Sequence, residues 1–141
     1  MRRLISFRTA AVTLLVLFAL AFLFQITVLA GLIPTEMVWG GRLANAQERT
    51  VGALVSLTIL LLMIGVVLLR MGRLGFGANG ELWRRVGQTS MWVIAVLFAL
   101  NTLGNLLAMD LRETLIFTPV TLVAALLAWR VALGELPASG E

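Results

Sequence analysis

The sequence predicts an all-α fold: a single domain, residues 1–141, that forms a transmembrane four-helix bundle with both termini in the cytoplasm. Four apolar stretches each have about the 20 residues that an α-helix needs to cross roughly 30 Å of hydrocarbon. The stretches are continuously apolar, which favours helices over the alternating pattern of a barrel strand. The basic residues are also divided unequally between the two expected sides. The expected spans are approximately 9–32, 49–69, 86–109 and 114–133, with an outer loop at 33–48 and an inner loop at 70–85.

The first stretch follows three arginines, an order that is also typical of a secretory signal peptide. Its apolar part is longer than about 20 residues, whereas signal peptides carry about 7–15. We therefore interpret it as an uncleaved first helix. The alternative is cleavage after Ala30, where Val28-Leu29-Ala30 loosely fits a small-residue site.

The second stretch begins with a capping pattern. Asn45 and Glu48 are spaced like an N-cap residue and the carboxylate three positions later, so Glu48 either closes the helix start or joins a polar site. Before it, Trp39-Gly40-Gly41-Arg42 is a tight amphipathic element. Arg42 either pairs with a nearby acid or covers the polar site and attracts an anionic or zwitterionic head group.

The fourth stretch contains a proline near its outer end. Either Thr118 caps a helix that starts at Pro119, or Pro119 kinks a helix that begins near Glu113 and frees the carbonyl of Leu115. Both alternatives place irregular backbone beside the polar residues of this end.

The arginines predict the orientation. All 11 basic residues are arginine, and eight fall on the side of the N-terminus against three on the other. Because cytoplasmic segments carry the excess of basic residues, we expect a multi-pass protein of the cell inner (plasma) membrane with both termini inside. The eight are Arg2, Arg3, Arg8, Arg70, Arg73, Arg84, Arg85 and Arg130, and the three are Arg42, Arg49 and Arg112.

Missing residue types limit the chemistry. The chain has no Cys, His or Tyr, and none of its seven acidic residues lies in the middle of an expected span. Thiolate and imidazole nucleophiles, bases and metal ligands are therefore excluded. We expect no catalytic residue, no metal site, no cofactor and no enzyme. The net charge of +4 comes from arginines at span ends, which indicates topology rather than nucleic-acid binding.

Polar side chains within the spans concentrate near the outer ends. Asn101, Gly104, Asn105 and Ala108 follow helical spacing and share one face of the third span. Because an unsatisfied buried amide costs on the order of 1–3 kcal/mol, we expect both asparagines to point into the bundle, with Asn101 deepest. The cluster is interpreted either as hydrogen-bonded contacts between helices or as a pocket that opens outward. The expected ligand-binding residues are Asn101, Asn105, Gln25, Arg42, Glu48 and Thr118.

Small residues accompany these polar groups and are expected to let helices approach closely. In the fourth span, Thr and Ala recur at helical spacing from Thr114 to Ala132, and the second span has Glu48, Gly52 and Ser56 at a spacing of four residues. The expected helix-packing residues are Gly104, Ala108, Gly52, Ser56, Thr121 and Ala125.

Several short stretches resemble a known family. They are Trp39-Gly40-Gly41-Arg42-Leu43, Phe98-Ala99-Leu100-Asn101-Thr102-Leu103-Gly104-Asn105-Leu106, Phe117-Thr118-Pro119 and Trp129-Arg130. Together they are similar to a family of small, uncharacterised bacterial membrane proteins with four spans. The resemblance covers most of the chain from Val38 onward. It implies the four-span architecture and no particular activity.

An intramembrane enzyme that uses Glu48 or Asp110 near Arg42 or Arg112 for acid–base chemistry is disfavoured because His, Cys and Tyr are missing, so two other functions compete. In the first, an integral membrane protein binds or passes a lipid head group or small polar solute through the outward-facing polar cluster. In the second, a structural or interaction subunit packs a second copy of itself or a membrane partner along the small residues of the third and fourth spans. The lipid bilayer is a partner in both.

Overall fold

Four α-helices make up the described part of the molecule. A computed structural model describes residues 5–34, 45–74, 80–107 and 111–134, except for the side chains of residues 112 and 113. These residues contain no strand, so the predicted all-α fold is confirmed. The helices are α1 (Phe7–Leu29), α2 (Ala46–Arg70), α3 (Gly80–Leu106) and α4 (Leu111–Ala132).

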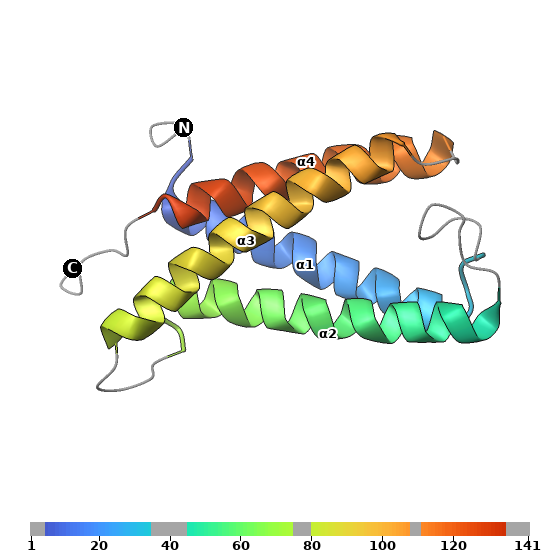
Figure 1. Ribbon diagram of the computed structural model, residues 1–141, viewed down its shortest axis with the longest axis horizontal. Helices are drawn as coiled ribbons and strands as arrows, with labels where there is room; N and C mark the ends of the chain where they lie inside the picture. The colour runs from blue at the N-terminus through green and yellow to red at the C-terminus, as the bar shows by residue number, and fades with distance from the viewer. Residues whose placement is uncertain (1–4, 35–44, 75–79, 108–110, 135–141) are drawn as a thin grey trace.

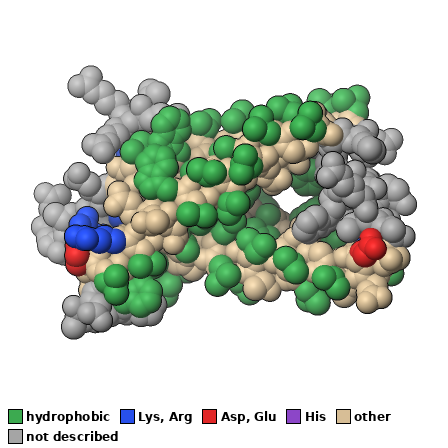
Figure 2. Space-filling model, in the orientation of Figure 1, with side chains coloured by type: hydrophobic (Ala, Val, Ile, Leu, Met, Phe, Trp, Pro, Cys, Tyr) green, Lys and Arg blue, Asp and Glu red, His purple; other side chains and the backbone are tan. Residues whose placement is uncertain are grey.

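Each helix is long and apolar enough to cross a membrane. The four candidate spans contain 19 to 27 residues, and their most apolar windows have mean hydropathy values between 1.5 and 2.8. On the face drawn in Figure 2, apolar side chains cover the middle of the molecule, and the charged side chains in view lie near its two ends. Because this distribution matches a hydrocarbon layer between two aqueous sides, the chain is a multi-pass membrane protein.

Glycine ends α1 and α2 in the same way. Gly31 and Gly72 have φ values of +74° and +70°, a region that glycine adopts without steric penalty. The amide N–H of Gly31 donates to the carbonyl of Val28 at 3.0 Å, and the N–H of Leu32 donates to the carbonyl of Thr27 at 3.0 Å. This pair of bonds satisfies carbonyls that the helix leaves open, and it ends α1 three residues before the predicted span end at residue 32.

The starts of the helices follow from local side chains. The Asn45 Oδ1 atom accepts a hydrogen bond from the backbone N–H of Glu48 at 2.9 Å, and its Nδ2 atom donates to Glu48 Oε1 at 3.2 Å. The capping interpretation of Asn45 and Glu48 is therefore confirmed. In α4 the helix begins at Leu111 and contains Pro119, so a helix that starts before Pro119 is confirmed and the capping alternative for Thr118 is wrong; the kink at Pro119 stays a prediction.

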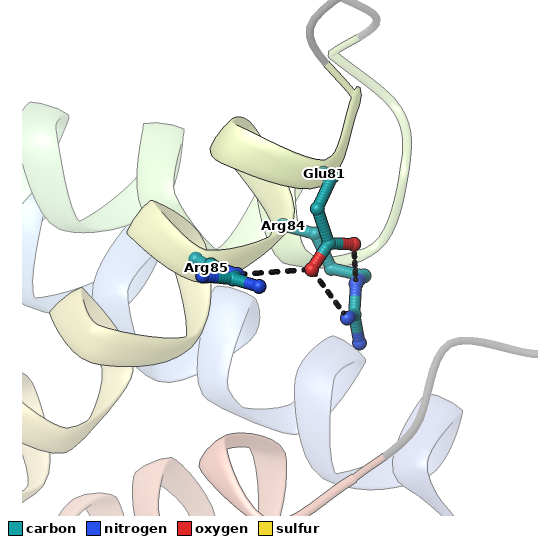
Figure 3. A network of polar contacts seen from close by, with 3 residues as sticks. All are labelled: Glu81, Arg84 and Arg85. Carbon is teal, nitrogen blue, oxygen red and sulfur yellow. Dashed lines mark hydrogen bonds and ion pairs between the residues drawn. The ribbon is translucent and has the colours of Figure 1, made fainter.

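The third helix begins six residues before the predicted span start at residue 86. In its first two turns Glu81 accepts hydrogen bonds from the Nε atoms of Arg84 and Arg85, each at 2.9 Å (Figure 3). Such pairs at three- and four-residue spacing stabilise a helix where its surface is polar. They explain why α3 extends beyond its apolar segment.

The helices run up and down, and each packs against its neighbours in the order α1, α2, α3, α4 and back to α1. The most extensive contact joins α3 to α4. The starts of α1 and α3 and the ends of α2 and α4 lie together, and we call this side of the molecule the terminus end (Figure 1). The other side, with the end of α1, the start of α2, the end of α3 and the start of α4, is the opposite end.

The main core lies in the half of the bundle that includes the terminus end. Its largest fully buried side chains are Phe18, Leu14, Met91, Val67 and Val131, and small alanines of α4 fill the space between them. Toward the opposite end the core divides. Val28 and Ala53 form a separate small cluster between α1 and α2, while α3 and α4 are joined there mainly by polar contacts.

The two helix pairs consequently separate toward the opposite end. In Figure 1 the α1–α2 pair and the α3–α4 pair lie apart there, and Figure 2 shows an opening between them in the same half of the molecule. This arrangement sets the position of the candidate site.

Candidate functional site

A cluster of hydroxyl and amide groups joins α3 to α4 near the opposite end. The Thr121 hydroxyl oxygen accepts hydrogen bonds from Asn105 Nδ2 at 3.2 Å and from Thr102 Oγ1 at 3.0 Å. The same Thr121 hydroxyl donates to the carbonyl of Phe117 at 2.9 Å. These three side chains are buried, and we call them the Thr121 cluster.

The hydrogen bonds of the Thr121 cluster are formed largely within the protein. Thr102 Oγ1 also lies 2.8 Å from the carbonyl of Phe98, and Thr114 Oγ1 donates to the carbonyl of Asn105 at 2.9 Å. Polar groups paired across two membrane helices stabilise their association by about 0.6–2 kcal/mol each. Of the two interpretations of this polar face, contacts between helices describe the Thr121 cluster better than an open pocket does.

The packing stripe of α4 lies where it was predicted. Thr121 and Ala125 are buried together with Ala128 and Ala132, while Thr114 and Thr118 are half-buried. On α2, Gly52 and Ser56 are half-buried, and Glu48 is exposed at the helix start. The expected interior face of α4 is therefore confirmed. The exposed Glu48 contacts the N-cap residue Asn45 at the start of α2.

Asn101 and Gly104 do not lie where they were expected. Both are exposed, and a Cβ atom built on Gly104 would have nothing within 4 Å. The prediction that Asn101 points into the bundle is wrong, as is close packing of Gly104 within this chain. The reason is rotational: α3 turns the line of Thr102 and Asn105 toward α4, and Asn101 lies about 100° around the helix from Thr102.

Two oxygen atoms in this half of the bundle are buried without a hydrogen-bond partner: Gln25 Oε1 on α1 and Thr118 Oγ1 on α4. The residue before each is a phenylalanine, and the rings of Phe24 and Phe117 meet edge to face with centroids 5.4 Å apart. Gln25 and Thr118 therefore each follow a residue through which α1 contacts α4, and they belong to different helix pairs. We call these two residues the acceptor pair.

A glutamate and an arginine lie at the start of α2 on the same end. The guanidinium of Arg49 packs against Gly31, where an added Cβ would lie 3.3 Å from Nη2, and Arg49 Nε has no hydrogen-bond partner. With Glu48 one residue earlier, this end offers both signs of charge. Arg42 and Ala108, which were also predicted as a ligand-binding and a packing residue, lie outside the described residues.

Thr102 is the functional residue that sequence reasoning missed. It is buried and joins the Thr121 cluster, but the spacing argument selected Asn101 one position earlier. A usable signal was present: Phe98, Thr102 and Asn105 also follow helical spacing, and Phe98 stacks on Phe18 of α1 with centroids 5.6 Å apart.

The arrangement can recognise a ligand by hydrogen bonding. The acceptor pair offers two oxygen lone-pair sites in an apolar surrounding, where an unmade hydrogen bond is costly. Within the described part of the chain no group of three or more His, Cys, Asp and Glu side chains could hold a metal ion.

Comparison with known proteins adds no relative. No protein-family model matches the chain, and neither a curated protein nor a solved structure matches it. Membership of a four-span bacterial family stays a prediction from the resemblance described above.

Proposed function

We propose that this protein is a membrane-embedded binding or transport component of the bacterial inner membrane, with its termini in the cytoplasm. It receives a lipid head group or small polar solute between its two helix pairs at the extracytoplasmic end. One observation carries the proposal: the acceptor pair, Gln25 and Thr118, places one unpartnered buried oxygen on each helix pair, next to the contact between Phe24 of α1 and Phe117 of α4.

The chemistry of the acceptor pair specifies the ligand class. Amide and hydroxyl oxygens accept hydrogen bonds, so the matching ligand donates them from ammonium or hydroxyl groups. Phosphatidylethanolamine has such donors, whereas phosphatidylcholine has none on its quaternary ammonium. The nearby charges of Glu48 and Arg49 suit a zwitterionic group.

Nanodiscs that contain equal amounts of phosphatidylethanolamine and phosphatidylcholine provide the test. Native mass spectrometry of the released protein measures which lipid remains bound. If each new hydrogen bond contributes about 1 kcal/mol, phosphatidylethanolamine is retained at least roughly fivefold over phosphatidylcholine. The variant Gln25→Leu/Thr118→Val loses this preference.

A matched control makes the same two chemical changes at exposed positions. Gln47 and Thr58 lie on the exposed surface of α2, and the Thr58 hydroxyl bonds only the carbonyl of Leu54 in its own helix. Gln47→Leu/Thr58→Val keeps the preference. Wild-type protein that retains both lipids equally, or a preference unchanged in Gln25→Leu/Thr118→Val, would exclude head-group binding at this site.

The exposed amide of Asn101 favours a second function, an interaction subunit. Asn101 lies five residues before the end of α3, about 7.5 Å along the helix, and Gly104 leaves open space one turn away on the exposed surface. An amide both donates and accepts, so two copies related by a two-fold axis can pair Asn101 with Asn101. Small residues then allow close approach.

Oligomeric mass in nanodiscs tests this second function. A dimer that dissociates in Asn101→Leu and in Gly104→Leu, but persists in Leu100→Ile on the same exposed surface, supports it. A monomer at all protein concentrations removes it. Lipid preference and mass are independent measurements, so failure of one function leaves the other testable.

A further inference from the structure

Two arginines are buried at the terminus end, at the other side of the bundle from the acceptor pair. Arg70, the last residue of α2, is 3% exposed, and Arg130, in the last turn of α4, is 8% exposed. Arginine is almost never fully buried unless it is paired. Two buried guanidinium groups therefore require partners that satisfy their charge and their N–H donors.

Both guanidinium groups lie in one region, where the ends of α2 and α4 meet the start of α1. Arg70 Nη2 donates a hydrogen bond to the carbonyl of Gly134, and its guanidinium carbon lies 5.6 Å from the centroid of the Phe7 ring. Arg130 Nε donates to the carbonyl of Ile5 at 2.8 Å. Ile5 lies two residues before Phe7, and Gly134 lies four residues after Arg130. Arg70 therefore contacts the start of α1 and the segment after α4, and Arg130 of α4 contacts the residues just before α1.

Neither charge is compensated within the described chain. The ion pairs there join Glu81 to Arg84 and Arg85, and none includes Arg70 or Arg130. Arg70 Nε and Arg130 Nη1 are buried and have no hydrogen-bond partner. Carbonyl and ring contacts satisfy some of the donors, but a buried charge stays costly until an opposite charge meets it.

The surrounding surface is also basic. Exposed Arg8 and Arg73 lie at this end, as does exposed Arg84 near the start of α3. Glu81 is the one acidic side chain that the structure describes here, and two arginines already bind it. The missing partner is therefore an anion.

We propose that Arg70 and Arg130 form a binding site for a phosphate-bearing anion, separate from the site at the opposite end. Guanidinium groups match the geometry of phosphate oxygens and bind them with strong, charge-assisted hydrogen bonds. If this end faces the cytoplasm, as the arginines predict, anionic lipid head groups lie at its level. The ring of Phe7 lies over the Arg70 guanidinium and borders the proposed site.

The main experiment compares phosphatidylglycerol with phosphatidylcholine in nanodiscs that contain the full chain. Exchange takes place in about 1 M NaCl, where a Debye length of roughly 3 Å suppresses general attraction to exposed charges. Native mass spectrometry then measures the enrichment of phosphatidylglycerol on the protein. A direct hydrogen bond to a charged group contributes roughly tenfold or more, so we expect an enrichment of at least tenfold.

Paired variants separate the buried site from the basic surface. Arg70→Gln/Arg130→Gln is expected to lower the enrichment at least fivefold, because the charge-assisted hydrogen bonds are lost. Arg8→Gln/Arg73→Gln removes the same charge from exposed positions, and this variant is expected to keep the enrichment of phosphatidylglycerol. Equal loss in the two double variants would overturn the proposal.

Thermal unfolding of the wild-type protein does not depend on whether the variants fold. An anion that binds the folded state raises Tm. A rise with phosphatidylglycerol alone assigns the site to a lipid, and a rise with inorganic phosphate over chloride at equal ionic strength assigns it to a soluble phosphate compound. No rise with either anion overturns the proposal.

The chain itself is the competing source of negative charge. Glu135 follows Gly134 in the sequence and lies outside the described residues. If phosphatidylglycerol is enriched only on Glu135→Gln and not on the wild-type protein, the carboxylate is the natural counter-charge and the site is structural. Enrichment on the wild-type protein excludes that assignment.

Discussion

At the scale of single residues, hydroxyl groups have different consequences according to what they contact. The Thr121 hydroxyl accepts hydrogen bonds from α3 and donates to its own helix, so it connects two elements. The Thr58 hydroxyl bonds only the carbonyl of Leu54 four residues earlier and is exposed. The first type of hydroxyl holds two helices together, and the second makes its hydrogen bond to a carbonyl of its own helix.

This difference predicts the effect of Thr121→Val. The substitution keeps the shape of the side chain but removes the acceptor for Asn105 and Thr102, so we expect a loss of about 1–2 kcal/mol in the free energy of unfolding. Thr58→Val is the control and changes it by less than about 0.5 kcal/mol. Reversible unfolding in bicelles with denaturing detergent measures both, and equal values would contradict the assigned role of Thr121.

The sequence predicted the buried residues correctly in the helix with one polar face that could point into the bundle. It failed in the helix with two such faces. On α4 the Thr and Ala stripe has no competitor, and its predicted interior face is the observed one. On α3, Asn101 with Asn105 and Thr102 with Asn105 both follow helical spacing. Which line faces inward depends on the position of α4 and on the stacking of Phe98 with Phe18, and these are tertiary contacts that α3 alone does not specify.

At the scale of elements, α4 is the helix most enclosed by the others. Ala124, Ala125 and Ala128 are buried where it packs in the bundle, and small side chains there let the helix axes come close. The contact between α3 and α4 thereby combines close backbone approach with the hydrogen bonds of the Thr121 cluster. This combination explains why these two helices stay together where the pairs separate.

Overpacking that contact is expected to be damaging. Ala128 is fully buried, so Ala128→Leu adds three carbons to filled space and costs about 1–3 kcal/mol of stability. Ala99 is exposed on α3, and Ala99→Leu makes the same change on a surface that faces lipid. Thermal unfolding in one detergent compares the two variants. A Tm of Ala128→Leu equal to that of Ala99→Leu would show that α4 is not enclosed.

The four helices could be predicted from sequence, but their ends could not. Crossing a bilayer requires about 20 apolar residues, which is a strong and local signal. The ends depend on particular side chains: Gly31 ends α1 early by adopting a positive φ, and Glu81 with its two arginines starts α3 early. Mean hydropathy reveals neither the positive φ of Gly31 nor the contacts of Glu81 with the two arginines.

At the scale of the whole molecule, the bundle is packed at one end and divided at the other. The main core fills the terminus half, and the helix pairs separate at the opposite end. The proposed ligands follow this division: a donor of hydrogen bonds where the bundle opens, and a phosphate-bearing anion where arginines are buried. Sequence reasoning located the first region from its concentration of polar residues. It missed the second because arginines at span ends were interpreted only as topology signals.

Sidedness of the membrane is the central claim, because both proposals need the two ends to face different compartments. The chain has no cysteine, so single cysteines report position directly. Pro34 is exposed at the opposite end and Arg73 at the terminus end. In spheroplasts, a membrane-impermeant maleimide is expected to label Pro34→Cys at once and Arg73→Cys only after permeabilisation. Labelling of Arg73→Cys in intact spheroplasts would contradict the account, whether or not the separate Pro34→Cys variant is also labelled.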